Sequence, residues 1–173
     1  MTRTFLIPLA CALCVQLFPL PGLTAEKPTY VSISHGQLSY ELKGQSADAD
    51  GILLGIGHRL TNSVSIEATF GQYDFDTIQL GDMAVSNAEA ETFELTTLVT
   101  WPLTKTYQPF FLLGLIHAEL EVPDLYEEDL QAPYIGLGLG IAGHESWQMR
   151  ASYKSFPDHA SAELLTVSLA YQF

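Results

Sequence analysis

The last twelve residues, 162–173, restrict the possible folds of this chain more than any other stretch. Apolar side chains occupy alternate positions there, at Leu165, Val167, Leu169, Tyr171 and Phe173. Small or polar residues fill the positions between them, with Leu164 as the one apolar exception. Because successive strand side chains point to opposite faces, the pattern predicts a strand with one apolar face and one polar face.

Seven further runs alternate in the same way and show no convincing helical period. They cover residues 30–42, 51–60, 63–73, 91–101, 107–120, 134–142 and 147–154. With the closing stretch they make eight predicted strands, the smallest usual number in an outer-membrane barrel. The predicted fold is therefore all-β: a transmembrane eight-stranded antiparallel up-and-down β-barrel.

The alternation also predicts which face of each strand is turned outward. The clearest run is 134–142, where Ile135, Leu137, Leu139 and Ile141 share one face and glycine or alanine fills the other. In a membrane barrel the branched residues face lipid and the small ones face the interior.

For two runs the alternation does not decide which face points outward. Residues 107–120 are apolar on both faces, so their orientation stays open. In residues 30–42 the apolar positions change face between Ile33 and Leu38. Either a bulge near Gly36 or a strand that rises out of the membrane would explain this change.

The connections sort by length, which a soluble barrel would not require. Short turns are predicted at residues 61–62, 104–106 and 143–146, where Gly, Asn, Ser and Thr are frequent. Longer loops are predicted at residues 43–50, 74–90, 121–131 and 155–161. Outer-membrane barrels have short periplasmic turns and long outer loops, so both mature termini are expected on the periplasmic side.

Residues 1–25 have the layout of a secretory signal peptide. Arg3 precedes an apolar run that ends near Phe18, and a small residue, Ala25, offers a cleavage site. The barrel domain is therefore predicted to span residues 26–173. Cys11 could instead mark a lipoprotein acylation site, although it comes early for a full apolar region; otherwise the mature chain has no cysteine.

The charge of the chain excludes some functions. The formal net charge is −13, which is unsuited to binding nucleic acid phosphates. No stretch after residue 25 approaches the roughly 20 apolar residues of a transmembrane helix. A slightly positive mean hydropathy beside this charge fits a barrel whose apolar residues are spread one in two.

Several short motifs resemble the OmpA-type superfamily, and more narrowly its small single-domain members of the OmpX and OmpW kind. They are the segments 55–60 (GIGHRL), 109–110 (PF), 136–140 (GLGLG) and 168–173 (SLAYQF). The resemblance covers essentially the whole mature chain. It implies that Leu169, Tyr171 and Phe173 form the assembly signal read by the barrel assembly machinery.

The same resemblance implies a structural or surface-interaction role in the outer membrane, with membrane lipid and lipopolysaccharide as partners. It implies neither catalysis nor a cofactor. A narrow channel or a carrier of small hydrophobic ligands remains an alternative.

Five charged residues fall on the predicted inward faces: Arg59, Glu67, Glu94, Arg150 and Lys154. They could line a selective channel. However, an eight-stranded barrel is only wide enough for its own side chains, and buried charges must pair. We expect a structural network of paired charges, with inward glycines leaving room for the longer side chains.

Aromatic and acidic residues gather near the ends of the predicted strands. Six aromatic residues are expected to form interfacial girdles: Trp101, Tyr107, Trp147, Tyr153, Tyr171 and Phe173. Acidic residues are expected in the long loops: Asp74, Asp76, Asp82, Glu121, Asp124, Glu127, Glu128 and Asp129. They could share divalent cations with lipid phosphates, contact cationic partners outside the cell, or simply be solvated.

Two other functions are weighed against this interpretation. His159 and Ser161, with Glu163, superficially resemble the His-x-Ser arrangement of lipid A deacylases, which are also eight-stranded barrels. The acidic partner of that family lies well down the closing strand, where this chain offers only Gln172. A soluble ligand-binding barrel would have its apolar face inside, whereas the inward positions here are mostly Gly, Ser, Thr, Glu and Arg.

Overall fold

The computed structural model describes residues 28–42, 45–75, 78–80, 83–85, 88–101, 103–122, 126–143, 146–157 and 162–173. The predicted signal peptide and its two cysteines lie outside these residues. Within them, no helix is long and apolar enough to span a membrane.

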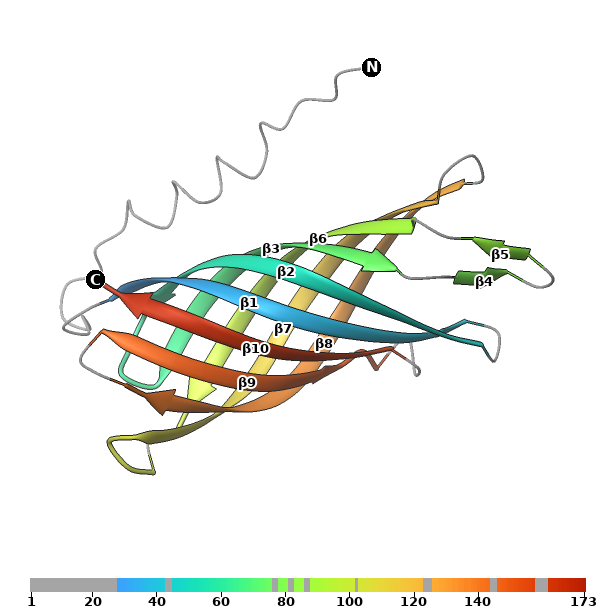
Figure 1. Cartoon of the computed structure of the whole chain (residues 1–173). Coiled ribbons are helices and arrows are strands. Elements are labelled where there is room, and N and C mark those ends of the chain that lie inside the picture. Colours follow the sequence, from blue (N-terminus) through green and yellow to red (C-terminus); the bar gives the residue numbers. More distant parts are fainter. Residues whose placement is uncertain are drawn as a thin grey trace, which may run out of the picture.

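Eight strands close into one antiparallel barrel, in the order β1-β10-β9-β8-β7-β6-β3-β2 (Figure 1). The strands are β1 (Thr29–Leu42), β2 (Gln45–Arg59), β3 (Val64–Phe75), β6 (Ala88–Thr100), β7 (Tyr107–Val122), β8 (Tyr126–Ala142), β9 (Trp147–Ser155) and β10 (Ala162–Gln172). A separate hairpin, β4 (Ile78–Leu80) and β5 (Met83–Val85), lies in the connection between β3 and β6. The predicted fold class is confirmed.

The short connections lie together at one end of the barrel, on the left in Figure 1. Two of them use the same turn chemistry, because the hydroxyls of Thr61 and Thr104 each accept hydrogen bonds from backbone N–H groups two and three residues later. The end of the chain lies there too, where the Phe173 N–H donates to the Thr29 carbonyl at 3.0 Å. We call this end the short-turn end.

The opposite end of the barrel, which we call the long-loop end, differs from the sequence prediction. Residues 43–50 and 121–131 were expected to be loops, but β2 begins at Gln45, β7 continues to Val122 and β8 begins at Tyr126. The strands extend because antiparallel pairing satisfies backbone groups that a loop would have to expose. The apolar alternation did not predict these extensions, because their outward residues are acidic rather than apolar.

Of the two explanations offered for the change of face in residues 30–42, the bulge near Gly36 is not observed. The pairing of β1 runs without interruption from Thr29 opposite His58 to Leu42 opposite Gln45, and the pairing with β10 is equally regular. Leu38 therefore stays on the inward face, where it packs against buried apolar residues. The apolar residues of this strand change face because the interior itself becomes apolar toward the long-loop end.

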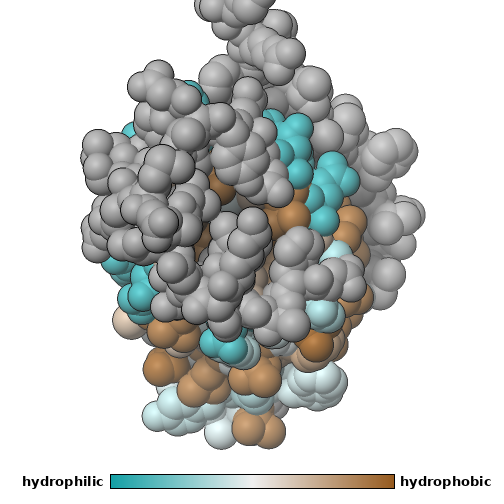
Figure 2. Space-filling view, turned by 90° about the vertical axis from the view of Figure 1, so that its right-hand side faces the viewer, coloured by the Kyte–Doolittle hydropathy of each residue, from teal (hydrophilic) through white to brown (hydrophobic). Residues whose placement is uncertain are grey.

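The residues on the outer face of the barrel wall are those that the alternation predicted. Leu137 is 65% exposed and Val167 is 50% exposed, whereas Glu94 is 0% and Arg150 is 8% exposed. Figure 2, which looks from the side of the β4–β5 hairpin, shows hydrophobic residues at the surface of the wall. This is the arrangement expected of a barrel surrounded by lipid rather than water.

The orientation of β7 is settled by the structure. Phe110, Leu112 and Ile116 are buried inside the barrel, while Leu113 and Leu115 point outward. Both faces of this strand are apolar because one meets the surroundings of the barrel and the other packs inside it.

The long-loop half of the interior is apolar, which the sequence analysis did not foresee. Its largest fully buried apolar side chains include Leu53, Tyr73, Tyr134 and Leu164. Inward glycines here leave room for rings rather than for charged side chains: a Cβ at Gly51 would lie 2.5 Å from Tyr73 Cδ1, and one at Gly114 would lie 2.5 Å from Tyr134 Cζ. An apolar plug therefore lies between the polar interior and the long-loop end.

Candidate functional site

Glu67 on β3 and Arg150 on β9 face each other across the interior. Arg150 Nη1 lies 2.9 Å from Glu67 Oε2, and both side chains are largely buried. Arg150 Nε donates to Gln148 Oε1 at 3.0 Å, and Gln148 Nε2 donates to Gln108 Oε1 at 2.8 Å. The ring of Tyr30 lies under the guanidinium, 4.5 Å from its Cζ to the ring centroid. The guanidinium of Arg150 is thus stabilised by a carboxylate, an amide oxygen and an aromatic ring at the same time.

Glu94 on β6 and Lys154 on β9 form a second pair, closer to the apolar plug. Lys154 Nζ lies 2.5 Å from Glu94 Oε2, and the Tyr134 hydroxyl donates to the same oxygen at 3.1 Å. Thr96 in turn hydrogen-bonds the Tyr134 hydroxyl. Glu94 Oε1 is buried and has no protein partner in the described structure. Both side chains are buried, so the stability of each charge depends strongly on the other.

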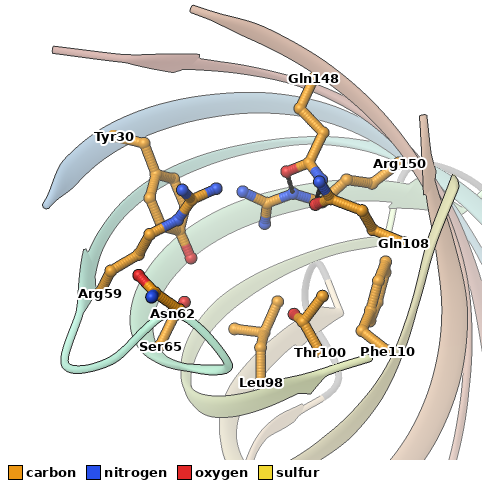
Figure 3. A pocket seen from close by; sticks show the side chains of 10 residues that line it. All are labelled: Tyr30, Arg59, Asn62, Ser65, Leu98, Thr100, Gln108, Phe110, Gln148 and Arg150. Carbon is orange, nitrogen blue, oxygen red and sulfur yellow. Dashed lines mark hydrogen bonds between the residues drawn. The ribbon is translucent and has the colours of Figure 1, made fainter. Parts of the chain in front are cut away.

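Arg59, the fifth predicted member of the network, is not brought into either pair. It lies at the short-turn end, where its side chain sits beside Tyr30 at the rim of a cavity (Figure 3). No ion pair of Arg59 is present among the described residues. The structure thus joins four of the five predicted residues in two ion pairs, and it places Arg59 beside the cavity at the short-turn end.

Small cavities lie along the interior of the described part of the barrel, and two of them adjoin the ion pairs. The first, of about 80 Å³, is at the short-turn end, and the second, of about 30 Å³, lies beside Glu67 and Lys154. Leu98, Phe110 and Arg150 line both, so these side chains stand between them. Since a water molecule occupies about 30 Å³ of liquid, such cavities suit individual waters rather than a continuous bore.

The aromatic residues gather mostly at the short-turn end of the outer wall. Trp101, Tyr107 and Trp147 are about half exposed. Trp147 also packs against Tyr171, with ring centroids 4.8 Å apart, and Tyr171 in turn stacks on Phe173. Tyr153 lies higher on the wall, opposite Leu137. Leu169 and Tyr171 share the outward face of β10, and Phe173 follows directly after the strand. Their role as an assembly signal stays a prediction.

The other end of the outer wall carries a band of carboxylates, which we call the acidic collar. Its members are the exposed residues Asp50, Asp74, Glu89, Glu91, Glu119, Glu121 and Asp129. All seven lie on strands, although five of them fall in predicted loops: Asp50, Asp74, Glu89, Glu121 and Asp129. Four stand in one row, with Asp50 opposite Asp74, Asp74 opposite Glu89 and Glu89 opposite Glu121.

Several predicted residues cannot be placed. Asp76, Asp82, Asp124, His159 and Ser161 lie outside the described residues. Glu127 and Glu128 belong to β8 by register, opposite Glu121 and Leu120. Glu163 lies exposed at the start of β10, on the outward face.

Sequence reasoning missed Tyr30 and Tyr134, which contact Arg150 and Glu94, and Gln108, which is linked to Arg150 through Gln148. A signal for each was present, because Tyr30 shares the inward phase of Ser32, and Tyr134 shares that of Gly136. Gln108 belongs to β7, whose orientation the sequence left open.

Comparison with known proteins agrees with this geometry. A family model described as the outer membrane protein beta-barrel domain matches residues 9–173. The chain belongs to this family. Family membership places the protein in the bacterial outer membrane, and the predicted resemblance to small eight-stranded outer-membrane barrels is confirmed. None of the curated proteins compared with the chain matches it.

Solved structures with the same fold are distant in sequence. The attachment invasion locus protein Ail of Yersinia pestis is 16% identical, with a TM-score of 0.56 over 86% of this chain and 100% of that one. The Neisserial surface protein A is 12% identical, with a TM-score of 0.60 over 84% of this chain and 97% of that one. The N-terminal barrel domain of Pseudomonas aeruginosa OprF is 17% identical, with a TM-score of 0.60 over 86% and 100%. Ail has also been solved with the heparin analogue sucrose octasulfate.

Proposed function

We propose that this outer-membrane barrel is a structural, non-conducting protein that presents its acidic collar to partners outside the cell. The single observation that carries the proposal is the closed interior. Two buried ion pairs and an apolar plug fill the barrel in series, and the cavities left between them are the size of a few water molecules. An interior of this kind stabilises the barrel and gives ions no continuous aqueous path.

The proposed orientation places the short-turn end and the mature termini in the periplasm and the acidic collar outside. It is supported by the extended hairpins at the collar end, since outer-membrane barrels keep their short turns on the periplasmic side. Lipopolysaccharide and lipid would surround the apolar wall. The barrel assembly machinery would read the closing strand with Leu169, Tyr171 and Phe173.

The chemistry of the collar points to cationic partners. Ail has been crystallised with a polyanionic ligand, but the collar of this chain carries seven exposed carboxylates and would repel such a molecule. A positively charged surface or ion is complementary to it. We propose no catalysis, because the described residues bring together no nucleophile and base with a third group to orient them.

Recordings in planar lipid bilayers test the closed interior. The purified barrel is expected to give no steady open-channel current, because Leu53, Tyr73, Tyr134 and Leu164 seal the interior above the ion pairs. A sixteen-stranded porin recorded under the same conditions serves as the conducting control. A sustained conductance that is lost when the protein is omitted would contradict the proposal.

Cysteine labelling on intact cells tests the orientation. The predicted mature chain has no cysteine, so Glu119→Cys in the collar and Lys105→Cys in a short turn each introduce one thiol. A membrane-impermeant maleimide is expected to label Glu119→Cys on intact cells and Lys105→Cys only after the outer membrane is opened. Both positions are exposed in the folded barrel, so labelling in the reverse order would overturn the orientation.

A further inference from the structure

Three side chains converge on the outer wall at the edge of the acidic collar. His117 and Glu119 lie on β7, and Asp129 lies on β8 directly opposite Glu119. One donor atom from each residue lies within 4.8 Å of the other two. His117 Nε2 is 3.2 Å from Glu119 Oε1, so this ring nitrogen faces the carboxylates.

We propose that His117, Glu119 and Asp129 form a site for a divalent cation of the zinc type. An imidazole nitrogen and two carboxylates are a ligand set that suits zinc and neighbouring transition metals, whereas magnesium and calcium prefer oxygen alone. The imidazole therefore distinguishes this site from the rest of the acidic collar, which offers only oxygen.

The environment of the site favours a bound cation. Glu119 lies between two cross-strand carboxylates, Glu91 on β6 and Asp129 on β8. Like charges directly opposite each other in a sheet destabilise it unless something neutralises them. Among the described residues no lysine or arginine does so, because Arg59 and Lys105 lie at the short-turn end and Arg150 and Lys154 lie inside the barrel.

The backbone holds the site in a geometry that requires little rearrangement. Its two strands are paired by register from Tyr107 opposite Ile141 to Val122 opposite Tyr126, so Glu119 and Asp129 are fixed neighbours. His117 is half-buried. Its Nδ1 is shielded from solvent and has no partner in the part of the chain that the structure describes, whereas its Nε2 faces the Glu119 carboxylate. Three protein ligands leave one or more positions of the ion open to water or to an anionic oxygen.

The site lies where the apolar wall ends. The next outward residue of β7 toward the short-turn end is Leu115, which is 60% exposed, and the next toward the long-loop end is Glu121. The proposal concerns the isolated folded barrel, so it holds or fails independently of the proposed non-conducting role.

Zinc titration of the detergent-solubilised full-length barrel by calorimetry tests the site. The protein is expected to bind one zinc ion per chain, and His117→Gln is expected to weaken the affinity at least about tenfold, since even outer-shell changes at metal sites cost about 10–100-fold. The matched control is His35→Gln. His35 Nε2 lies 3.5 Å from Asp50 Oδ1 on the same outer wall, but no third donor among the described residues completes a cluster there.

Three outcomes decide the proposal. One-to-one zinc binding that is weakened by His117→Gln and by Asp129→Asn, and unchanged by His35→Gln, supports it. The absence of saturable zinc binding overturns it. Binding that His117→Gln leaves unchanged, or calcium binding as tight as zinc binding, also overturns it, because the carboxylates alone would then account for the ion. Heat-modifiable migration on gels reports whether each variant is folded.

Discussion

Replacing Glu94 with glutamine is expected to lower the free energy of unfolding of the barrel by about 3–5 kcal/mol, because it leaves the Lys154 ammonium buried without a counter-charge. Glu94 is 0% exposed and accepts hydrogen bonds from Lys154 and Tyr134 at the boundary of the apolar plug. Urea titration of the folded protein in lipid vesicles, followed by tryptophan fluorescence, measures the change.

A double replacement separates the cost of the lone charge from the value of the pair. Glu94→Leu combined with Lys154→Met removes both charges and is expected to be close to neutral, since apolar replacements of buried ion pairs often are. Glu91→Gln, on the exposed outward face of the same strand, controls for the loss of a carboxylate in β6. If Glu94→Gln were no more harmful than Glu91→Gln, the pair would not be a buried structural element.

Replacing Leu137 with arginine is expected to destabilise the inserted barrel by about 2–4 kcal/mol, the cost of placing a charge near the middle of a bilayer. Leu137 is 65% exposed on the outward face of β8, and apolar residues flank it at Ile135 and Leu139. The same unfolding titration in lipid vesicles measures this loss.

Leu103→Arg is the matched control, because Leu103 is 75% exposed in a short turn beyond the ends of the strands. Its replacement is expected to cost about 0–1 kcal/mol, as found for charges near the membrane interfaces. In a water-soluble barrel both leucines would be ordinary exposed residues, and neither arginine would matter. Equal, small effects at the two positions would therefore mean that lipid does not surround the wall.

The sequence by itself determined the strand count and the facing of most side chains. The alternation of Ile135, Leu137, Leu139 and Ile141 with glycine can be read without knowing any partner strand, because the period of two is a local property of the backbone. The two threonine turns could be predicted for the same reason, since each turn is made by residues a few positions apart.

The local pattern of apolar residues left side-chain facing open and predicted strand length wrongly where the surroundings of a strand change along its length. Leu38 and Leu164 looked like exceptions because the interior was assumed to be polar throughout, yet both face an apolar plug made by strands from around the barrel. Parts of the collar strands were predicted to be loops because Glu121 and Asp129 occupy outward positions that are apolar elsewhere on the wall.

Only the tertiary structure decided which charges meet. Glu94 and Lys154 belong to β6 and β9, and Glu67 and Arg150 to β3 and β9, which are not neighbours in the sheet. Closure of the barrel brings these strands face to face across the interior. The contact within each ion pair therefore depends on the register and curvature of every strand between them. Arg59 shares the inward phase but lies at the short-turn end, outside both pairs. A strand's alternation is set by its own backbone, whereas contacts across the interior are set by how all eight strands close together.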